Sequence, residues 1–397
     1  MEFKKKVLEN GLTVLFEKRD VSVTTVMLAV KYGSAYETWQ EKGIAHFMEH
    51  LCFKGTEKRT AKQIASELEK VGGELNAFTH EEITAYHVKL PSNHLGLAVD
   101  VISDIFFYPT FPEDEVKREA RVICEEIKMY KDNPRMHVLE NIKLNLYEKP
   151  FGFTGLGPAE NVLGMSREQL YNKHNEIYVA GNSVLCVVGD NDFDEVVSLA
   201  EKMKVREGDF KPEVPEVKKR IVDSSEKRKG IEQVNLAIGF HFPLAGEKDR
   251  YAAEVFSAIL GEGMSSKLFT EVREKRGLVY GVKTDLDLGK DYGYMIIWAG
   301  TEDGKEDEVR KVSLEEFRKM KDLTEAELAE AKVQVIGNRK VESENSNDVA
   351  VDLVLEEVAG DANDYYKFEE KINSVSLEDI KKLAEILEYS FFSLGPE

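Results

Sequence analysis

The chain has 397 residues, of which 42% are hydrophobic, and a formal net charge of -20 at pH 7. This length exceeds one comfortable core and favours two domains of nearly 200 residues each. The charge argues against a nucleic-acid or anionic-membrane surface, and no apolar run approaches the roughly 20 residues that cross a bilayer.

The first half of the sequence carries strand and helix patterns. The expected strands lie at 5–18, 22–34, 74–79, 82–90 and 183–188. Helices are expected at 42–54, 60–71 and 192–203, with helical periods dominating from the fourth strand to about residue 178.

Periodicity is lost at 206–220, where Pro, Gly and charged residues collect, so we expect a linker there between domains at 1–205 and 221–397. The second half repeats the order of the first, which suggests an internal duplication. Its expected elements are a strand at 232–242, helices at 248–260 and 264–276, strands at 278–287 and 291–300, and several further helices. We expect an α+β fold in which each domain packs a largely antiparallel sheet against helices.

The three cysteines, Cys52, Cys124 and Cys186, cannot all pair with one another and form no CxxC cluster. Free thiols fit a reducing compartment. The N-terminal stretch lacks the apolar core of a signal peptide, so the sequence favours a cytoplasmic protein.

The segment GIAHFMEHLCFKG at 43–55 predicts an amphipathic helix. At about 100° per residue, His46, Glu49 and His50 share one face and the apolar residues lie opposite. Histidines four residues apart can both reach one zinc ion, and Glu49 beside them can take a proton from a water molecule on that zinc. A solvated helix face that happens to carry two histidines is the bland alternative.

The string HFMEH is an H-x-x-E-H signature and resembles the pitrilysin/insulinase family of metallopeptidases. The two-domain length of the chain resembles the branch of the processing peptidases. The resemblance implies a third ligand, a glutamate some 75 residues downstream on another helix. In the segment 113–134, Glu125 and Glu126 compete for that role. A helical wheel places Glu126 on the flank of the inward stripe and Glu125 opposite it, and the family pattern also selects Glu126.

The resemblance also implies residues around the metal and the substrate. Glu119 matches a carboxylate that supports the site, with a surface carboxylate as the alternative. The stretch 72–87 resembles the family's strand beside the active site, where a substrate backbone can add as a strand, so Asn76 and Ala77 are expected to contact substrate. Arg273 and Tyr280 match the family's Arg/Tyr pair, implied to contact substrate and stabilise the tetrahedral intermediate; a helix-surface Arg and a sheet-core Tyr are the alternative.

These features predict a zinc-dependent endopeptidase with one Zn²⁺ per chain, because the second half has no metal-ligand set at the corresponding segment AEVFSAIL. The resemblance implies two chains, identical or related, that enclose unfolded peptides or N-terminal extensions in a chamber, where Arg273 and Tyr280 would approach the metal of the partner chain. The net charge favours basic peptides. The alternatives are a non-catalytic, peptide-binding subunit of a heterodimer, or a metal-dependent hydrolase of a non-peptide amide.

Overall fold

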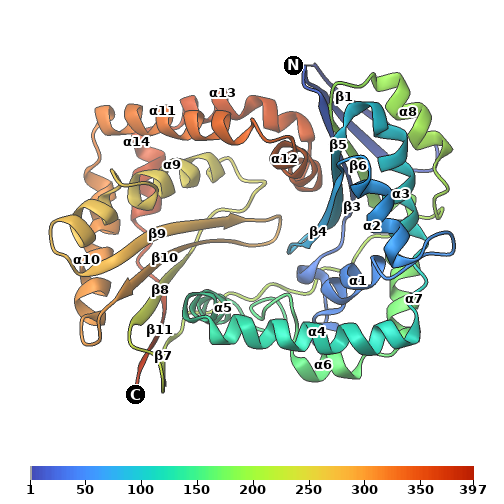
Figure 1. Cartoon of the computed structure of the whole chain (residues 1–397). Coiled ribbons are helices and arrows are strands. Elements are labelled where there is room, and N and C mark those ends of the chain that lie inside the picture. Colours follow the sequence, from blue (N-terminus) through green and yellow to red (C-terminus); the bar gives the residue numbers. More distant parts are fainter. Residues whose placement is uncertain (1) are drawn as a thin grey trace. The chain divides into compact units, whose positions relative to one another are not determined.

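Two β-sheets, each with its own helices, make up the described part of the chain, residues 2–397, in this computed structural model (Figure 1). They belong to two compact units. Unit 1 contains the chain up to Ile127, Thr154–Pro215 and Glu342–Tyr365; unit 2 contains Lys128–Phe153, Glu216–Val341 and Tyr366–Glu397. The expected α+β fold is confirmed.

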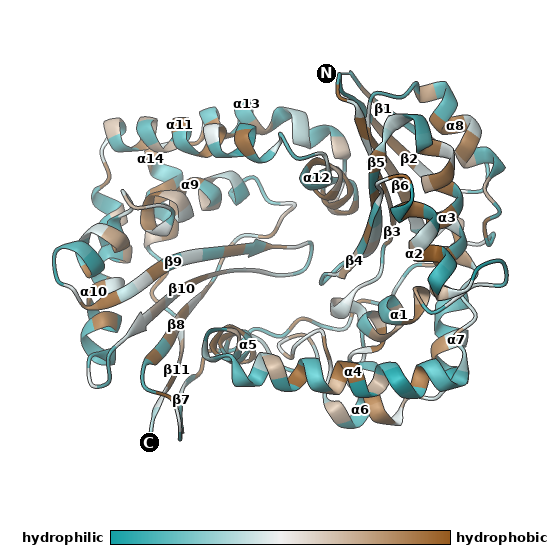
Figure 2. Ribbon diagram, viewed as in Figure 1, coloured by the Kyte–Doolittle hydropathy of each residue, from teal (hydrophilic) through white to brown (hydrophobic). Residues whose placement is uncertain are grey.

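The sheet of unit 1 has six strands, and only β2 and β6 run parallel to each other. Their order is β1 (Glu2–Val7), β2 (Thr13–Lys18), β6 (Ser183–Gly189), β3 (Val23–Val30), β5 (Thr84–Pro91) and β4 (Glu74–Thr79). Both faces of the central strands are buried, as expected of continuous apolar runs such as β6, which is largely brown in Figure 2. Strand β4 forms one edge of this sheet.

Helices cover both faces of this sheet. Alternate residues such as Val26 and Leu28 share a core with α1 (Ile44–Cys52), α3 (Leu95–Phe107) and α8 (Phe193–Lys202). The intervening residues, such as Met27 and Ala29, pack against α12 (Ser346–Ala359).

The sheet of unit 2 has five strands, again with one parallel pair, β7 and β11. The order is β7 (Asp223–Arg228), β11 (Ser390–Pro396), β8 (Val234–His241), β10 (Gly293–Thr301) and β9 (Val279–Leu288). One face shares a core with α9 (Arg250–Gly261), α10 (Glu306–Lys319) and α14 (Leu377–Ala384). The other face packs against α5 (Pro134–Leu146), where a side chain on Gly239 would collide with Leu146.

The two sheets repeat one topology. Taken in chain order, β2 to β6 of unit 1 occupy the same sheet positions as β7 to β11 of unit 2, and β1 is an addition. In both sheets the first and last of these five strands form the parallel pair. This equivalence supports the internal duplication.

The units are not two continuous stretches of chain, in contrast to the expected domains 1–205 and 221–397. The segment that carries α5 comes from the first half but belongs to unit 2, and the segment that carries α12 comes from the second half but belongs to unit 1. One boundary, after Pro215, falls within the expected linker 206–220. The halves have therefore exchanged the helices that cover the second face of each sheet.

The remaining helices complete the two cores. They are α2 (Ala61–Glu69), α4 (Glu113–Asp132), α6 (Ala159–Gly164), α7 (Arg167–Ile177), α11 (Glu325–Glu342), α13 (Phe368–Ser374) and the π-helix η5 (Phe269–Glu274). Short 3₁₀ turns occur at Ser34–Tyr36, Trp39–Glu41, Ser92–His94, Ala180–Asn182, Met320–Asp322 and Ala362–Lys367. Within residues 2–397, no helix combines the length and the apolar character needed to cross a membrane.

Three details differ from the expected elements. The stretch 5–18 is two strands, because the chain turns tightly between Leu8 and Leu12, where Gly11 donates a hydrogen bond from its N–H to the Leu8 carbonyl and has φ +87°. The expected helix 264–276 reduces to the short π-helix η5. Strands β7 and β11 were not predicted: β7 reads DSSEKR, with little apolar alternation, and β11 follows a run of helices.

Candidate metal centre

Helix α1 begins at a tightly built N-terminus. Gly43 caps it with φ +98°, and a Cβ there would lie 2.6 Å from the carbonyl oxygen of Leu156, so only glycine fits. The buried Glu37 carboxylate accepts hydrogen bonds from the backbone N–H groups of Gly43 at 3.1 Å and Ala45 at 2.8 Å. A carboxylate at this end of a helix pairs with the positive end of the helix dipole. The buried Lys42 ammonium lies 3.4 Å from Glu37, which fixes the start of α1 firmly.

The two faces of α1 differ as the wheel predicted. Ile44, Phe47, Met48 and Leu51 are fully buried in the core of unit 1. On the opposite face the imidazole rings of His46 and His50 lie 4.6 Å apart, one helical turn from each other.

Helix α4 brings Glu126 to these histidines. Its Oε2 lies 3.7 Å from His46 Nε2 and 3.6 Å from His50 Nε2. The three side chains form a cluster whose ligand atoms all lie within 4.8 Å of one another. Glu125 is exposed and is not in this cluster.

The cluster fits a zinc ion. Ligand bonds of about 2.1 Å in a tetrahedral site separate neighbouring donor atoms by about 3.4 Å, close to the separations of Glu126 from the two histidines. Nitrogen from two imidazoles and oxygen from one carboxylate form a donor set typical of catalytic zinc, which leaves a fourth position open. His46, His50 and Glu126 are therefore the residues that would hold the ion.

Glu119 lies one double turn before Glu126 on α4. Its Oε2 is 3.2 Å from His50 Nδ1, the ring atom on the far side from Glu126, and its Oε1 is 2.8 Å from Lys54 Nζ. A carboxylate on the second ring nitrogen holds a metal-binding histidine in one tautomer and orientation. Burial alone would raise the pKa of Glu119, but the hydrogen bonds from His50 and Lys54 outweigh it and hold the pKa below the ordinary value.

Burial also sets the protonation of the cluster. It lowers the pKa of His46 to about 3, and the neighbouring His50 acts in the same direction. His46 is therefore neutral at physiological pH, the form that binds metals.

Glu49 lies beside the histidines on the same face of α1 and is held by the edge strand. Thr79, the last residue of β4, donates a hydrogen bond from its hydroxyl to Glu49 Oε2 at 2.6 Å. Burial raises the pKa of the Glu49 carboxyl, and this hydrogen bond opposes the rise. A carboxyl whose pKa is raised towards neutrality is suited to accept a proton and release it again.

The predicted substrate residues fall in two places. Asn76 and Ala77 lie on β4, and the Asn76 side-chain oxygen accepts a hydrogen bond from the Ala77 N–H at 2.9 Å. Arg273 and Tyr280 lie in unit 2. The Arg273 guanidinium covers the ring of Phe269 at 4.5 Å, and Tyr280 is 49% exposed at the start of β9.

Two partners of the cluster escaped the sequence reasoning. Thr79 was missed because a hydroxyl at the end of a strand carries no pattern that points to a carboxylate 30 residues away. Lys54 was missed because its pairing with Glu119 joins the turn after α1 to α4, two segments far apart in the sequence. HFMEHLCFK does place Lys54 one turn after His50, and that spacing is the signal from which it could have been found.

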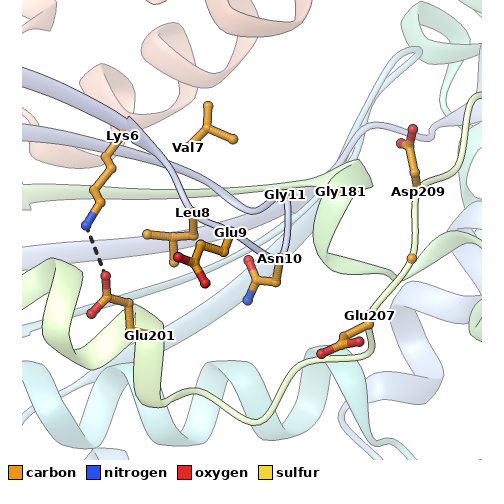
Figure 3. A pocket seen from close by; sticks show the side chains of 11 residues that line it. Lys6, Val7, Leu8, Glu9, Asn10, Gly11, Gly181, Glu201, Glu207 and Asp209 are labelled. Carbon is orange, nitrogen blue, oxygen red and sulfur yellow. Dashed lines mark hydrogen bonds and ion pairs between the residues drawn. The ribbon is translucent and has the colours of Figure 1, made fainter.

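A hollow of unit 1 lies away from the metal cluster (Figure 3). It is lined by the β1–β2 turn and by acidic side chains including Glu9, Glu201, Glu207 and Asp209. Its one drawn ion pair, Lys6 with Glu201 at 3.0 Å, is solvent-exposed. No residue of the metal cluster lines it, so we assign it no role.

Comparisons with known proteins identify the family of the chain. Residues 13–159 match the family model described as insulinase (peptidase family M16), and residues 164–335 match the model of the peptidase M16 inactive domain. His46, Glu49, His50 and Glu126 all lie within the first match.

Relatives extend the match along most of the chain. A protein of Rickettsia felis, named as an uncharacterized zinc protease, is 36% identical over 83% of this chain and 81% of its own length. A Bacillus subtilis protein of the same description is 30% identical over 99% of this chain and 98% of its own.

Solved structures show the same fold. A protease from Helicobacter pylori matches with a TM-score of 0.92 at 24% identity, covering 100% of this chain and 99% of its own. A Pseudomonas fluorescens structure titled as a peptidase M16 inactive domain matches with a TM-score of 0.90 at 21% identity over 100% and 99%. The resemblance drawn from HFMEH is confirmed, and the chain belongs to peptidase family M16, the insulinase family.

Proposed function

We propose that the chain is a zinc-dependent endopeptidase that holds one zinc ion through His46, His50 and Glu126. The observation that carries the proposal is the convergence of these three side chains from two helices beside Glu49. The names of the relatives, zinc proteases, support the choice of metal and reaction class.

Glu49 is the general base of the proposed reaction. A zinc ion held by His46, His50 and Glu126 would supply Lewis acidity, which would lower the pKa of a water molecule and polarise the peptide carbonyl. Glu49 accepts the proton from the attacking water and delivers it to the leaving amine. The Thr79 hydroxyl donates a hydrogen bond to one carboxylate oxygen of Glu49. This bond restricts rotation of the Glu49 side chain and so fixes the direction of its second carboxylate oxygen.

Strand β4 is the proposed substrate platform. It pairs with β5 and lies at the edge of its sheet, so its outer N–H and C=O groups are available to an extended peptide. Asn76 and Ala77 would contact that peptide three and two residues before Thr79. Backbone pairing requires an extended chain, so unfolded peptides or N-terminal extensions are the proposed substrates, and the net charge of -20 favours basic ones.

Arg273 and Tyr280 are proposed to contact the substrate and stabilise the charge on the tetrahedral intermediate. We further propose that two chains, identical or related, pair and that each supplies these two residues to the other's metal site. None of the three cysteines forms a disulfide within residues 2–397, which supports a reducing, cytoplasmic setting.

Cleavage of an internally quenched basic peptide tests the reaction. We expect activity that a chelator abolishes and zinc restores, and that Glu49→Gln removes while zinc binding persists, because glutamine keeps the shape and loses the base. If the wild-type chain binds zinc and peptide but cleaves none, the catalytic proposal fails and the role of a peptide-binding partner subunit takes its place.

Mixing two inactive variants tests the pairing. A dimer of a Glu49→Gln chain with a Tyr280→Ala chain has one site with an intact base and an intact partner tyrosine. Random exchange of subunits in a homodimer should then restore roughly one quarter of wild-type activity. No recovery after proven exchange would mean that each chain uses its own Tyr280.

A further inference from the structure

Tyr280 lies at an irregularity in the pairing of β9 with β10. Gly300 pairs with Gly281, but the next residue, Thr301, pairs with Val279, so Tyr280 has no partner across the ladder. An extra residue of this kind is a β-bulge, which bends the strand and redirects a side chain.

The bulge moves Tyr280 from one face of the sheet to the other. Val282 and Thr284 face the buried core, and strict alternation would put residue 280 on that same face. Instead Val279, only 6% exposed, takes the core position opposite the buried Thr301. Tyr280 is thereby turned outward, where 49% of its surface is exposed.

A glycine provides the surface on which the ring rests. A Cβ built on Gly300 would have Cζ, Oη and Cε1 of Tyr280 as its three nearest heavy atoms, all at 2.5 Å or less. Gly300 lies in a regular strand and is not among the glycines with positive φ, so its backbone does not require glycine. What requires glycine at this position is the ring of Tyr280.

The ring is also bounded on its side. Trp298, two residues before Gly300 on the same face of β10, meets the Tyr280 ring edge-on, with ring centroids 6.2 Å apart and an interplanar angle of 75°. Arg135 covers the Trp298 ring at 4.6 Å, which holds the indole in place.

We propose that Gly300 and the bulge position Tyr280 for substrate, so that Gly300 is a positioning residue of the peptidase reaction. This inference rests on the proposed function, because it takes Tyr280 to contact the substrate. We call the surface formed by Gly300 and Trp298 the seat of the Tyr280 ring. The seat fixes the position of the tyrosine hydroxyl, whereas an exposed aromatic side chain without such a surface would sample several rotamers.

Gly300→Ala separates this role from a structural one. The atoms that a new methyl group meets are the outer end of a half-exposed ring, which can swing away without disturbing the core. We therefore expect the melting temperature to change little while kcat/KM falls at least about tenfold, with KM and kcat both affected. Tyr280→Ala should cost roughly 100-fold, the size of the loss of one transition-state donor.

A double-mutant cycle makes the test specific. In a Tyr280→Ala background the collision is gone, so adding Gly300→Ala should change kcat/KM by less than about twofold. Losses that multiply would overturn the proposal. Gly337→Ala in α11 is the matched control, because a side chain there meets nothing within 4 Å and should leave activity unchanged.

A measurement that needs no substrate, fluorescence quenching of Trp298, distinguishes an error in the positioning of Tyr280 from an error in the proposed peptidase function. The chain has two tryptophans and 15 tyrosines, so in a Trp39→Phe background, excitation beyond the tyrosine absorption band reports on Trp298 alone. Displacing the ring exposes the indole edge, and acrylamide quenching should rise equally in Gly300→Ala and Tyr280→Ala. Unchanged quenching in Gly300→Ala would refute the seat even if the wild type cleaves peptides. If the wild type cleaves none, the peptidase function fails and so does the positioning role of Gly300 in it, whatever the quenching.

Discussion

Replacing Thr79 by valine isolates the hydrogen bond that holds Glu49. Valine keeps the branched shape of threonine and its preference for a strand, so β4 should remain intact. The change removes one donor to a carboxylate at 2.6 Å. Hydrogen bonds to charged groups contribute about 1.5–3 kcal/mol, and 1.4 kcal/mol corresponds to a factor of ten. If the bond is fully used in the transition state, kcat/KM should fall roughly tenfold to 100-fold.

The assay is steady-state cleavage of the quenched peptide, with zinc content measured on the same samples. Thr79→Ser is the matched control, since it retains the hydroxyl and should keep most of the activity. Zinc content should be equal in all three proteins because Thr79 does not belong to the metal cluster. A valine variant as active as the serine variant would refute the idea that Thr79 orients the base.

Three further predictions concern the site and its surroundings. Glu126→Gln should lose stoichiometric zinc while Glu125→Gln keeps it, measured by metal analysis after dialysis; the reverse would exchange the ligand assignment. Glu119→Gln should weaken zinc binding roughly 10- to 100-fold in competition with a chelator, and unchanged affinity would contradict its support of His50. Burial lowers the pKa of His174 from 6.5 to about 3. Between these two pH values only the unfolded chain binds a proton at this residue, so the free energy of unfolding decreases as the pH is lowered, by up to about 1.4 kcal/mol per pH unit. In urea unfolding at pH 6.5 and 5, His174→Gln should lessen that fall; an identical slope would argue against a buried neutral imidazole.

Much of the metal cluster could be predicted from the sequence because helices are periodic. The spacing in HFMEH fixes which side chains share a face of α1, and the apolar stripe of α4 orients Glu126 inward and Glu125 outward. The distances that join α1 to α4 depend on tertiary packing, and the sequence alone gives them only through the family resemblance.

Features that depend on pairing between strands were less accessible. The bulge leaves a trace in VYGV, where the two core valines, Val279 and Val282, are three residues apart instead of two. Regular alternation from Val282 would put Tyr280 in the sheet core, as the sequence-based alternative had it, and the bulge breaks this alternation. Strand β7 reads DSSEKR and has no apolar alternation from which it could be predicted. Its position in the sheet depends on pairing with β11, which comes about 160 residues later in the chain.

Because α5 and α12 are exchanged, neither half of the chain contains all the helices that cover its own sheet. A fragment ending in the linker would carry the first sheet without α12 and expose the apolar side chains of Leu15, Met27 and Cys186 to water. Such a bare sheet face is a template for aggregation. Residues from about 342 must therefore be synthesised before the first sheet is complete, so this half of the molecule finishes folding only near the end of translation.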